Sequence, residues 1–225
     1  MSLLRREIAG VYRELGLRGL NVGASGNVSG RTGRGMVITP TGITGDSVTP
    51  KMLVATDLDG NHKGRIKPSS EWMMHAAIYR QDPAAMVIVH THSNGATALA
   101  CLNQPLPAFH YAVLAFGGPD VRIAPYITFG TLDLAEAAAE AIEGRTACLL
   151  ANHGMICHGP TARDALLAAL RLEALCRQYL LALSAGTPRL LTDDEIAAAR
   201  IRFASYGQQP APPPDKRPDK PKETA

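Results

Sequence analysis

The sequence has 225 residues, of which 46% are hydrophobic and 19% are charged, and its formal net charge is +3. This is the balance of a globular protein that is large enough to bury a core, and it lacks the strongly basic face of a nucleic-acid-binding protein. No uncharged apolar run approaches the roughly 18 residues of a membrane span, and the amphipathic N-terminus carries no export signal. We therefore expect neither a nucleic acid nor a membrane as a partner.

The four cysteines, Cys101, Cys148, Cys157 and Cys176, lie far apart in the sequence and form no C-x-x-C pair. Each lies in an apolar stretch, where an unpaired cysteine usually packs as a small hydrophobic side chain. Disulfides persist in oxidising compartments and are rare in the cytosol. The pattern therefore predicts reduced thiols and a cytoplasmic protein.

The first third of the sequence predicts two helices with strands between them. Ser69 or Ser70 can cap the N-terminus of the second helix, which begins at Glu71 and ends near Arg80. The elements expected before it are, in order, a helix over 3–18, a polar glycine-rich stretch over 21–34, a strand over 36–38, and a strand with a hairpin within 46–66.

The rest of the sequence alternates strands and helices. A buried strand over 86–89 runs directly into His90, and a strand over 147–151 has 155–157 as its hairpin partner. Thr161 can cap a long helix that ends near Ser184. The remaining expected elements are helices over 94–102, 133–142 and 193–205, and an apolar element over 111–116.

Several connections between these strands are too short for the crossovers that parallel strands need. We therefore predict an α/β fold with a central mixed sheet, mainly antiparallel, that lies between layers of helices. One domain is expected over 1–207. Residues 208–225 contain six prolines and many charges, and a segment of this composition cannot bury enough apolar surface to order itself. We expect a disordered tail there.

Three histidines have the spacing and position of metal ligands. His90 and His92 are two residues apart at the end of an apolar strand, so their side chains point to the same face. His153 follows another strand, and Gly154 after it permits a tight turn. Imidazole is the commonest side-chain ligand of zinc, and three protein ligands with an open position are typical of a catalytic site. The pattern predicts a metal-dependent enzyme.

The other four histidines do not share this pattern. His62 lies in a polar turn and is expected to be solvated, and His158 is expected at the surface. His110 could line the site. His75 follows Glu71 by four residues on the same helix, so it is either structural or a second partner of the site.

Two other kinds of catalysis are excluded by residues that are missing. Outside the tail the only lysines are Lys51, Lys63 and Lys67, all in polar stretches, whereas a Schiff-base lysine needs desolvation to lower its pKa. The sequence also has no G-x-S-x-G nucleophile elbow. Carbonyl chemistry would therefore have to rely on a metal.

Several short motifs together resemble the class II aldolase/adducin family, and within it the branch that cleaves L-fuculose 1-phosphate. Any one of them is weak, but all of them in order are specific, and the resemblance covers about residues 5–207. The motifs are Gly26-Asn27-Val28-Ser29, Thr39-Pro40-Thr41-Gly42-Ile43, Pro68-Ser69-Ser70-Glu71, His90-Thr91-His92, His110-Tyr111, residues 124–131, Asn152-His153-Gly154, residues 191–196 and Tyr206-Gly207.

The resemblance implies a site and an assembly. Zinc, one ion per chain and replaceable by another divalent metal, would be held by Glu71, His90, His92 and His153, with Glu71 as acid and base. Tyr111 of a neighbouring subunit would protonate or orient the aldehyde oxygen. The family assembles as a homotetramer with sites between subunits. The positions that match the family's phosphate ligands are Asn27, Ser29, Thr41, Gly42, Ser69 and Ser70.

The residues themselves agree with a phosphate site. Hydroxyls, amides and backbone N–H groups at glycine-rich turns and at a helix N-terminus bind a phosphate dianion without arginine. Such residues also serve simply as turn and cap residues. The expected reaction is zinc-dependent cleavage of a ketose 1-phosphate, such as L-fuculose 1-phosphate, into dihydroxyacetone phosphate and an aldehyde.

Four alternatives remain open. Aldolases for 5-deoxy- or 5-methylthio-pentulose 1-phosphates would carry the same main motifs. Sugar-phosphate 4-epimerases of the family have Asp where this sequence has Glu71, which favours an aldolase. A methylthioribulose-1-phosphate dehydratase also uses an H-x-H site, but Tyr111 and Phe129 argue against it. Adducin-like interaction modules are expected to lack the metal ligands, and here all four positions are filled.

Overall fold

The computed structural model describes residues 2–203. Their helices are α1 (Leu3–Leu17), α2 (Trp72–Gln81), α3 (Asn94–Cys101), the 3-10 helix η1 (Tyr111–Phe116), α4 (Leu132–Ile142), α5 (Ala162–Ala185) and α6 (Asp193–Phe203). Their strands are β1 (Asn27–Thr32), β2 (Gly35–Ile38), β3 (Val54–Asp57), β4 (Val87–Thr91), β5 (Ile123–Ala124), β6 (Ala147–Leu150) and β7 (Gly154–Gly159).

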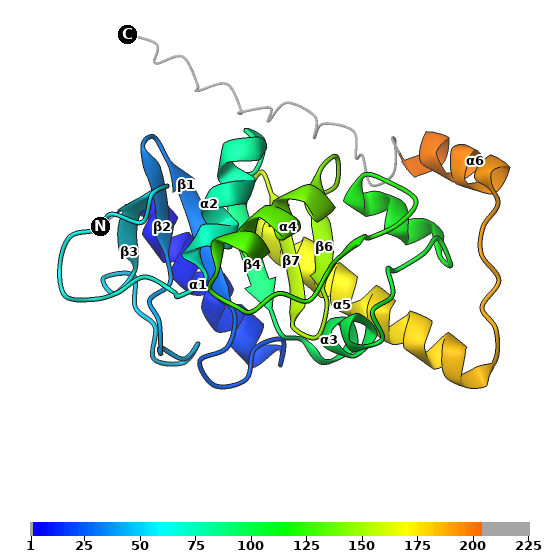
Figure 1. The fold of residues 1–225 in the computed structure, drawn as a ribbon, viewed down its shortest axis with the longest axis horizontal. Coiled ribbons are helices and arrows are strands. Elements are labelled where there is room, and N and C mark those ends of the chain that lie inside the picture. The colour runs from blue at the N-terminus through cyan, green and yellow to red at the C-terminus, as the bar shows by residue number, and fades with distance from the viewer. Residues whose placement is uncertain (1, 204–225) are drawn as a thin grey trace, which may run out of the picture.

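The seven strands form one sheet in the order β3-β2-β1-β4-β7-β6-β5. Every neighbouring pair is antiparallel except β5 and β6, which are parallel. Helices α2 and α4 cover one face, while α1, α3 and α5 cover the other (Figure 1). This confirms the predicted mainly antiparallel sheet between helix layers.

Each face of the sheet has its own apolar core, and the alternation along β4 shows why. Val87 and Val89 pack toward α1 and α5, whereas Ile88 packs toward α2 and α4. Side chains two residues apart share a face of a strand. His90 therefore lies on the face of Ile88, beneath the start of α2.

Most predicted elements are confirmed, with small shifts in their bounds. Thr161 caps α5, and its hydroxyl accepts a hydrogen bond from the Asp164 backbone N–H. The strand expected within 46–66 is β3, which begins at Val54. Among residues 2–203, no helix combines the length and apolarity needed to cross a membrane.

Three expectations are corrected. Strand β1 lies within the polar, glycine-rich stretch 21–34, where no strand was predicted, and the short β5 was not predicted either. The N-cap of α2 is Glu71, without a side-chain capping hydrogen bond, rather than Ser69 or Ser70. His158 is buried on β7, where its Nε2 lies 3.2 Å from the Arg145 carbonyl oxygen. The predicted tail lies outside the described residues.

Candidate metal centre

The first candidate ligand, His90, is fixed by its strand. It pairs with Asn27 of β1 on one side and Ile156 of β7 on the other, and its side chain is fully buried. The ring Nδ1 donates to the Met155 carbonyl oxygen at 2.9 Å. That bond selects the tautomer in which Nε2 keeps its lone pair, which is the form that binds a metal.

His92 lies just beyond β4, at the junction with α3. The N-cap of α3, Ser93, makes no side-chain cap. Instead the Glu173 carboxylate of α5 accepts from the backbone N–H groups of Gly95 and Ala96, at 2.9 and 3.0 Å. An anion is favourable at a helix N-terminus. Glu173 therefore fixes the junction that carries His92.

His153 lies in the turn between β6 and β7. Asn152 adopts a left-handed backbone conformation with φ of 54°. At Gly154 a Cβ atom would collide with the Thr91 carbonyl oxygen. This turn brings His153 against the end of β4, so the glycine in Asn152-His153-Gly154 is required for the close approach.

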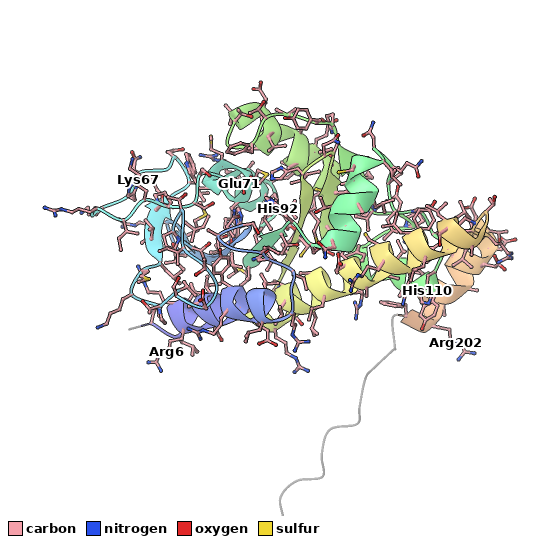
Figure 2. All side chains as sticks on the ribbon, turned by 90° about the horizontal axis from the view of Figure 1, so that it is seen from below. Arg6, Lys67, Glu71, His92, His110 and Arg202 are labelled. Carbon is pink, nitrogen blue, oxygen red and sulfur yellow. The ribbon has the colours of Figure 1, made fainter. Side chains whose placement is uncertain are left out.

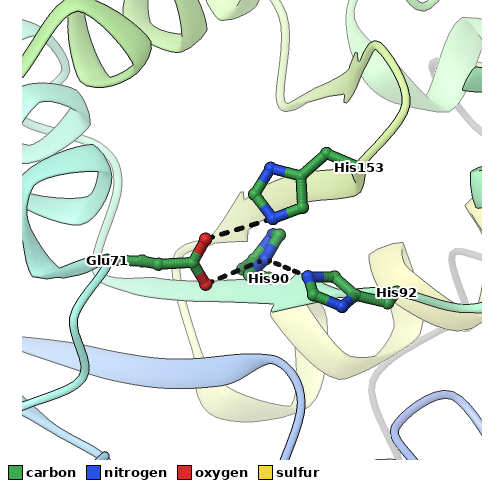
Figure 3. Close-up of side chains that lie close together, drawn as sticks. All are labelled: Glu71, His90, His92 and His153. Carbon is green, nitrogen blue, oxygen red and sulfur yellow. Dashed lines mark hydrogen bonds and ion pairs between the residues drawn. The ribbon is translucent and has the colours of Figure 1, made fainter. Parts of the chain in front are cut away.

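The structure brings the four predicted ligands together (Figure 3). Nε2 of His90 lies 3.0 Å from Nε2 of His92 and 3.2 Å from Glu71 Oε2, and Nε2 of His153 lies 3.1 Å from Glu71 Oε1. A tetrahedral zinc site places neighbouring ligand atoms about 3.3 Å apart. The three imidazoles and one carboxylate therefore have the spacing of a shared cation.

The electrostatics also fit a cation. Burial raises the pKa of Glu71, but the charge of His90 and the contact with His153 outweigh it and hold that pKa well below its usual range. Burial and the charges of His90 and His153 lower the pKa of His92 to about 4. The buried Oε1 of Glu71 contacts Nε2 of His153 and forms no hydrogen bond with any other described residue. An ionised carboxylate beside three imidazoles is a ligand set for a divalent metal.

A cavity of about 340 Å³ adjoins this cluster, and Glu71, His92 and His153 form part of its wall. Five of the six predicted phosphate residues also line it, namely Asn27, Thr41, Gly42, Ser69 and Ser70. A larger open depression of about 780 Å³ lies beside β3 and is lined by none of the four ligands. The chemistry therefore favours the smaller cavity as the site.

Ser29, expected among the phosphate ligands, does not line the cavity. Its side chain is fully buried, and its hydroxyl contacts His75 and Tyr79 beneath the sheet rather than the cavity. Asn27 and Ser29 share a face of β1 because they are two residues apart, but Asn27 is nearer the end of the strand. Ser29 therefore cannot touch a ligand in this cavity.

Two aromatic residues of the cavity wall were not predicted as site residues. Tyr126 and Phe129 line the cavity together with Ile127, and both aromatic side chains are about two-thirds exposed, at 64% and 65%. Residues 124–131 were matched to the family as a motif, but no periodicity marks which of them face the site. The signal that could have found them is two aromatic residues in a polar loop, because such side chains are usually buried.

Tyr111 does not line the cavity of its own chain. It begins η1, is half exposed, and stacks on the His110 ring with centroids 4.6 Å apart. In Figure 2, Glu71 and His92 lie near the middle of the molecule, whereas His110 lies toward the end that carries Arg202. Within one chain, neither Tyr111 nor His110 belongs to the group of candidate metal ligands or to the cavity wall.

Comparison with known proteins finds that the chain is similar to class II aldolases. The family described as "Class II Aldolase and Adducin N-terminal domain" matches residues 6–180. A 5-methylthioribulose-1-phosphate/5-deoxyribulose-1-phosphate aldolase of Rhodospirillum rubrum is 43% identical over 213 residues, which cover 93% of this chain and 96% of that protein. An L-fuculose phosphate aldolase of Escherichia coli is 42% identical over 205 residues, which cover 91% and 95%. A solved structure of L-fuculose 1-phosphate aldolase superposes with a TM-score of 0.86 at 37% identity and covers 91% of this chain and 97% of that chain.

Proposed function

The chain belongs to the class II aldolase and adducin family and is a class II aldolase, and we propose that it holds one zinc ion through Glu71, His90, His92 and His153. The support is the ligand chemistry, since three imidazoles and one carboxylate are a typical zinc set. Another divalent metal remains the alternative. Metal analysis of the purified protein should find about one zinc per chain.

Metal binding should release a proton, which gives a pH dependence. Burial disfavours the charged form of His90, but the charge and hydrogen bond of Glu71 outweigh burial and raise the pKa of His90 in the metal-free protein. A metal takes only the neutral imidazole. We therefore expect zinc affinity to fall as pH falls below neutrality and zinc uptake to acidify a weakly buffered solution. Titration with a pH indicator measures this, and uptake without proton release would contradict it.

The reaction that we propose is retro-aldol cleavage of a ketose 1-phosphate. The observation that supports it is a group of candidate metal ligands beside a cavity with hydroxyl and amide groups on its wall. Asn27, Thr41, Gly42, Ser69 and Ser70 would hold the phosphate, as hydroxyls and backbone N–H groups do elsewhere. None of these residues carries a charge, so the phosphate would be held by hydrogen bonds.

Retro-aldol cleavage moves two protons and breaks one carbon–carbon bond of the ketose. The C4 hydroxyl passes its proton to water, the C3–C4 bond breaks to give an aldehyde, and C3 takes up a proton that Glu71 has drawn from water, which gives dihydroxyacetone phosphate. Glu71 carries the proton at C3. When bound, zinc supplies Lewis acidity that stabilises negative charge on the ketose oxygens.

The aldehyde half of the substrate would contact Tyr126 and Phe129. These side chains give the cavity an apolar wall, which suits a terminal methyl or alkylthio group better than a hydroxymethyl group. L-Fuculose 1-phosphate and the 5-deoxy- and 5-methylthio-pentulose 1-phosphates all end in such a group. We propose L-fuculose 1-phosphate as the first substrate to test and the two pentulose phosphates as the alternatives.

The decisive assay measures dihydroxyacetone phosphate released from a panel of ketose 1-phosphates. The panel should include the three candidates and a matched ketose 1-phosphate that ends in a hydroxymethyl group. We expect the deoxy and alkylthio substrates to be preferred, and the metal-free enzyme to be inactive. An enzyme that carries zinc and cleaves none of them would overturn the proposed function.

Tyr111 should act in the site of a neighbouring subunit of a homotetramer. A phenol is neutral at pH 7 and can donate to an alkoxide near a cation, yet Tyr111 is half exposed and lines no part of its own cavity. Tyr111→Phe and His153→Ala should each be defective. Refolding them as an equal mixture should combine an intact Tyr111 with an intact His153 in about a quarter of the sites. Mixed oligomers no more active than the separate variants would contradict the shared site.

A cytoplasmic location is also proposed. All four cysteines are free, and three of them are buried, which suits a reducing compartment.

A further inference from the structure

A row of buried polar side chains lies between β1 and α2 and adjoins the candidate metal ligand Glu71. Asn27 and Ser29 come from alternate positions of β1, and His75 and Tyr79 are four residues apart on α2. Their side chains are 2%, 0%, 0% and 2% exposed, respectively. The rest of this face is an apolar core, and a buried polar group there is costly unless it is hydrogen-bonded.

The four side chains form an unbroken chain of hydrogen bonds that ends on Glu71. Tyr79 Oη lies 2.8 Å from Ser29 Oγ, and Ser29 Oγ lies 2.7 Å from His75 Nδ1. His75 Nε2 lies 2.5 Å from Asn27 Oδ1. Finally, Asn27 Nδ2 donates to Glu71 Oε2 at 2.9 Å.

The direction of every bond follows from the carboxylate at the end. An ionised carboxylate only accepts, so Asn27 must present its NH₂ group to Glu71 and its Oδ1 to His75. His75 Nε2 must then carry a proton. Complete burial favours a neutral ring, so Nδ1 accepts from the Ser29 hydroxyl, and Ser29 accepts from Tyr79. All four bonds point toward Glu71, and hydrogen bonds aligned in this way polarise one another.

The far end of the chain is also anchored. The Arg31 guanidinium donates to the backbone carbonyl oxygens of Tyr79, Asp82 and Ala85 and lies over the Tyr79 ring, 4.7 Å from its centroid. The tyrosine that starts the chain is thus held in place by strand β1.

We propose that His75 is a positioning residue: its Nε2–H holds the Asn27 amide with NH₂ toward Glu71, and this orients the Glu71 carboxylate for the metal and for proton transfer. This rests on the proposed function of Glu71. Without the Nε2–H group, the Asn27 amide could turn over and place Oδ1 against the carboxylate, where two acceptors repel. The reversed amide would also misplace Glu71 relative to His90 and His153.

Two variants at one position separate donation from packing. His75→Gln keeps an N–H group that can reach Asn27, whereas His75→Leu fills similar space without one. We expect His75→Leu to lower both zinc affinity and kcat by about 10- to 100-fold, the usual effect of removing a partner of a metal ligand. His75→Gln should recover most of that loss. The measurements are chelator competition on the metal-free protein, kcat and KM separately, and thermal unfolding.

His158→Leu is the matched control, because it also replaces a buried histidine but lies at the far end of β7 from the cluster. It should lower thermal stability and leave zinc affinity and kcat of the folded protein unchanged. In ¹⁵N-histidine spectra of the metal-free wild-type protein, His75 should be neutral with its proton on Nε2. The His75 signals are assigned as those that are absent from the spectrum of His75→Gln.

Should His75→Leu fail to fold, Ser29→Ala takes its place, since it frees the tautomer of His75 while removing only one hydroxyl. Folded His75→Leu or Ser29→Ala protein with wild-type zinc affinity and turnover would overturn the proposal, as would an Nδ1–H tautomer in the wild type. Equal losses in His75→Leu and His75→Gln would do the same. A wild-type protein without zinc or aldolase activity would instead overturn the proposed function.

Discussion

Replacing His92 or His153 by alanine should remove bound zinc and essentially all aldolase activity while the protein stays folded. Both side chains are partly exposed at the cavity, so water can fill the space that each leaves. Loss of one of four ligands leaves Glu71 without the cation that its charge requires. Zinc per chain, turnover and the unfolding temperature of each metal-free variant are the measurements.

The third histidine should behave differently. His90 is fully buried and donates to the Met155 carbonyl oxygen, so His90→Ala leaves a cavity and an unsatisfied acceptor. We expect that variant to lose stability as well as zinc. His62→Ala, at an exposed position in a polar turn, is the control and should match the wild type. Full zinc content and rate in His92→Ala or His153→Ala would show that the ligand set is wrong.

The histidine ligands were predictable because short stretches of sequence mark each of them. The spacing of His90 and His92 at the end of an apolar strand fixes both side chains to one face, and Gly154 marks the turn that carries His153. The fold class followed from the short connections between strands, which exclude parallel crossovers. Assigning Glu71 needed the family resemblance, because a single acidic residue at a helix start also suits the helix dipole.

Strand β1 was not predictable in the same way. Its inward residues Asn27 and Ser29 are polar, which is typical of a loop, and they are tolerated only because His75 and Tyr79 satisfy them. A Cβ at Gly30 would require the Leu4 side chain of α1 to shift. Such pairings join residues more than forty positions apart, and no local pattern encodes them.

The aromatic part of the cavity wall was not predictable from the sequence either. Tyr126 and Phe129 lie in the loop between β5 and α4 and line the cavity, and residue type alone does not predict that they face it. The proposed role of Tyr111 cannot be deduced from a single chain. Its side chain is half exposed there, and the site in which it should act belongs to a neighbouring subunit.

The largest effect on the chemical step is expected from Glu71→Gln. The amide has the shape of the carboxylate but cannot carry a proton, and removing a general acid or base typically costs ~10²–10⁴-fold in rate. The Asn27 NH₂ group and His75 are both retained, so the amide oxygen can still accept from Asn27. We therefore expect kcat to fall far more than the affinity for substrate, with zinc retained when it is supplied in excess.

A single exchange experiment separates proton transfer from metal loss. Dihydroxyacetone phosphate, incubated with wild-type enzyme in D₂O and without aldehyde, should exchange a C3 hydrogen if the Glu71 carboxylate accepts that proton as proposed. Zinc-loaded Glu71→Gln should bind the same compound without exchange. Glu71→Asp is the matched control: it keeps the proton carrier on a shorter side chain, so slow exchange should persist. Normal exchange in zinc-loaded Glu71→Gln would assign the proton to another group and remove Glu71 from that role.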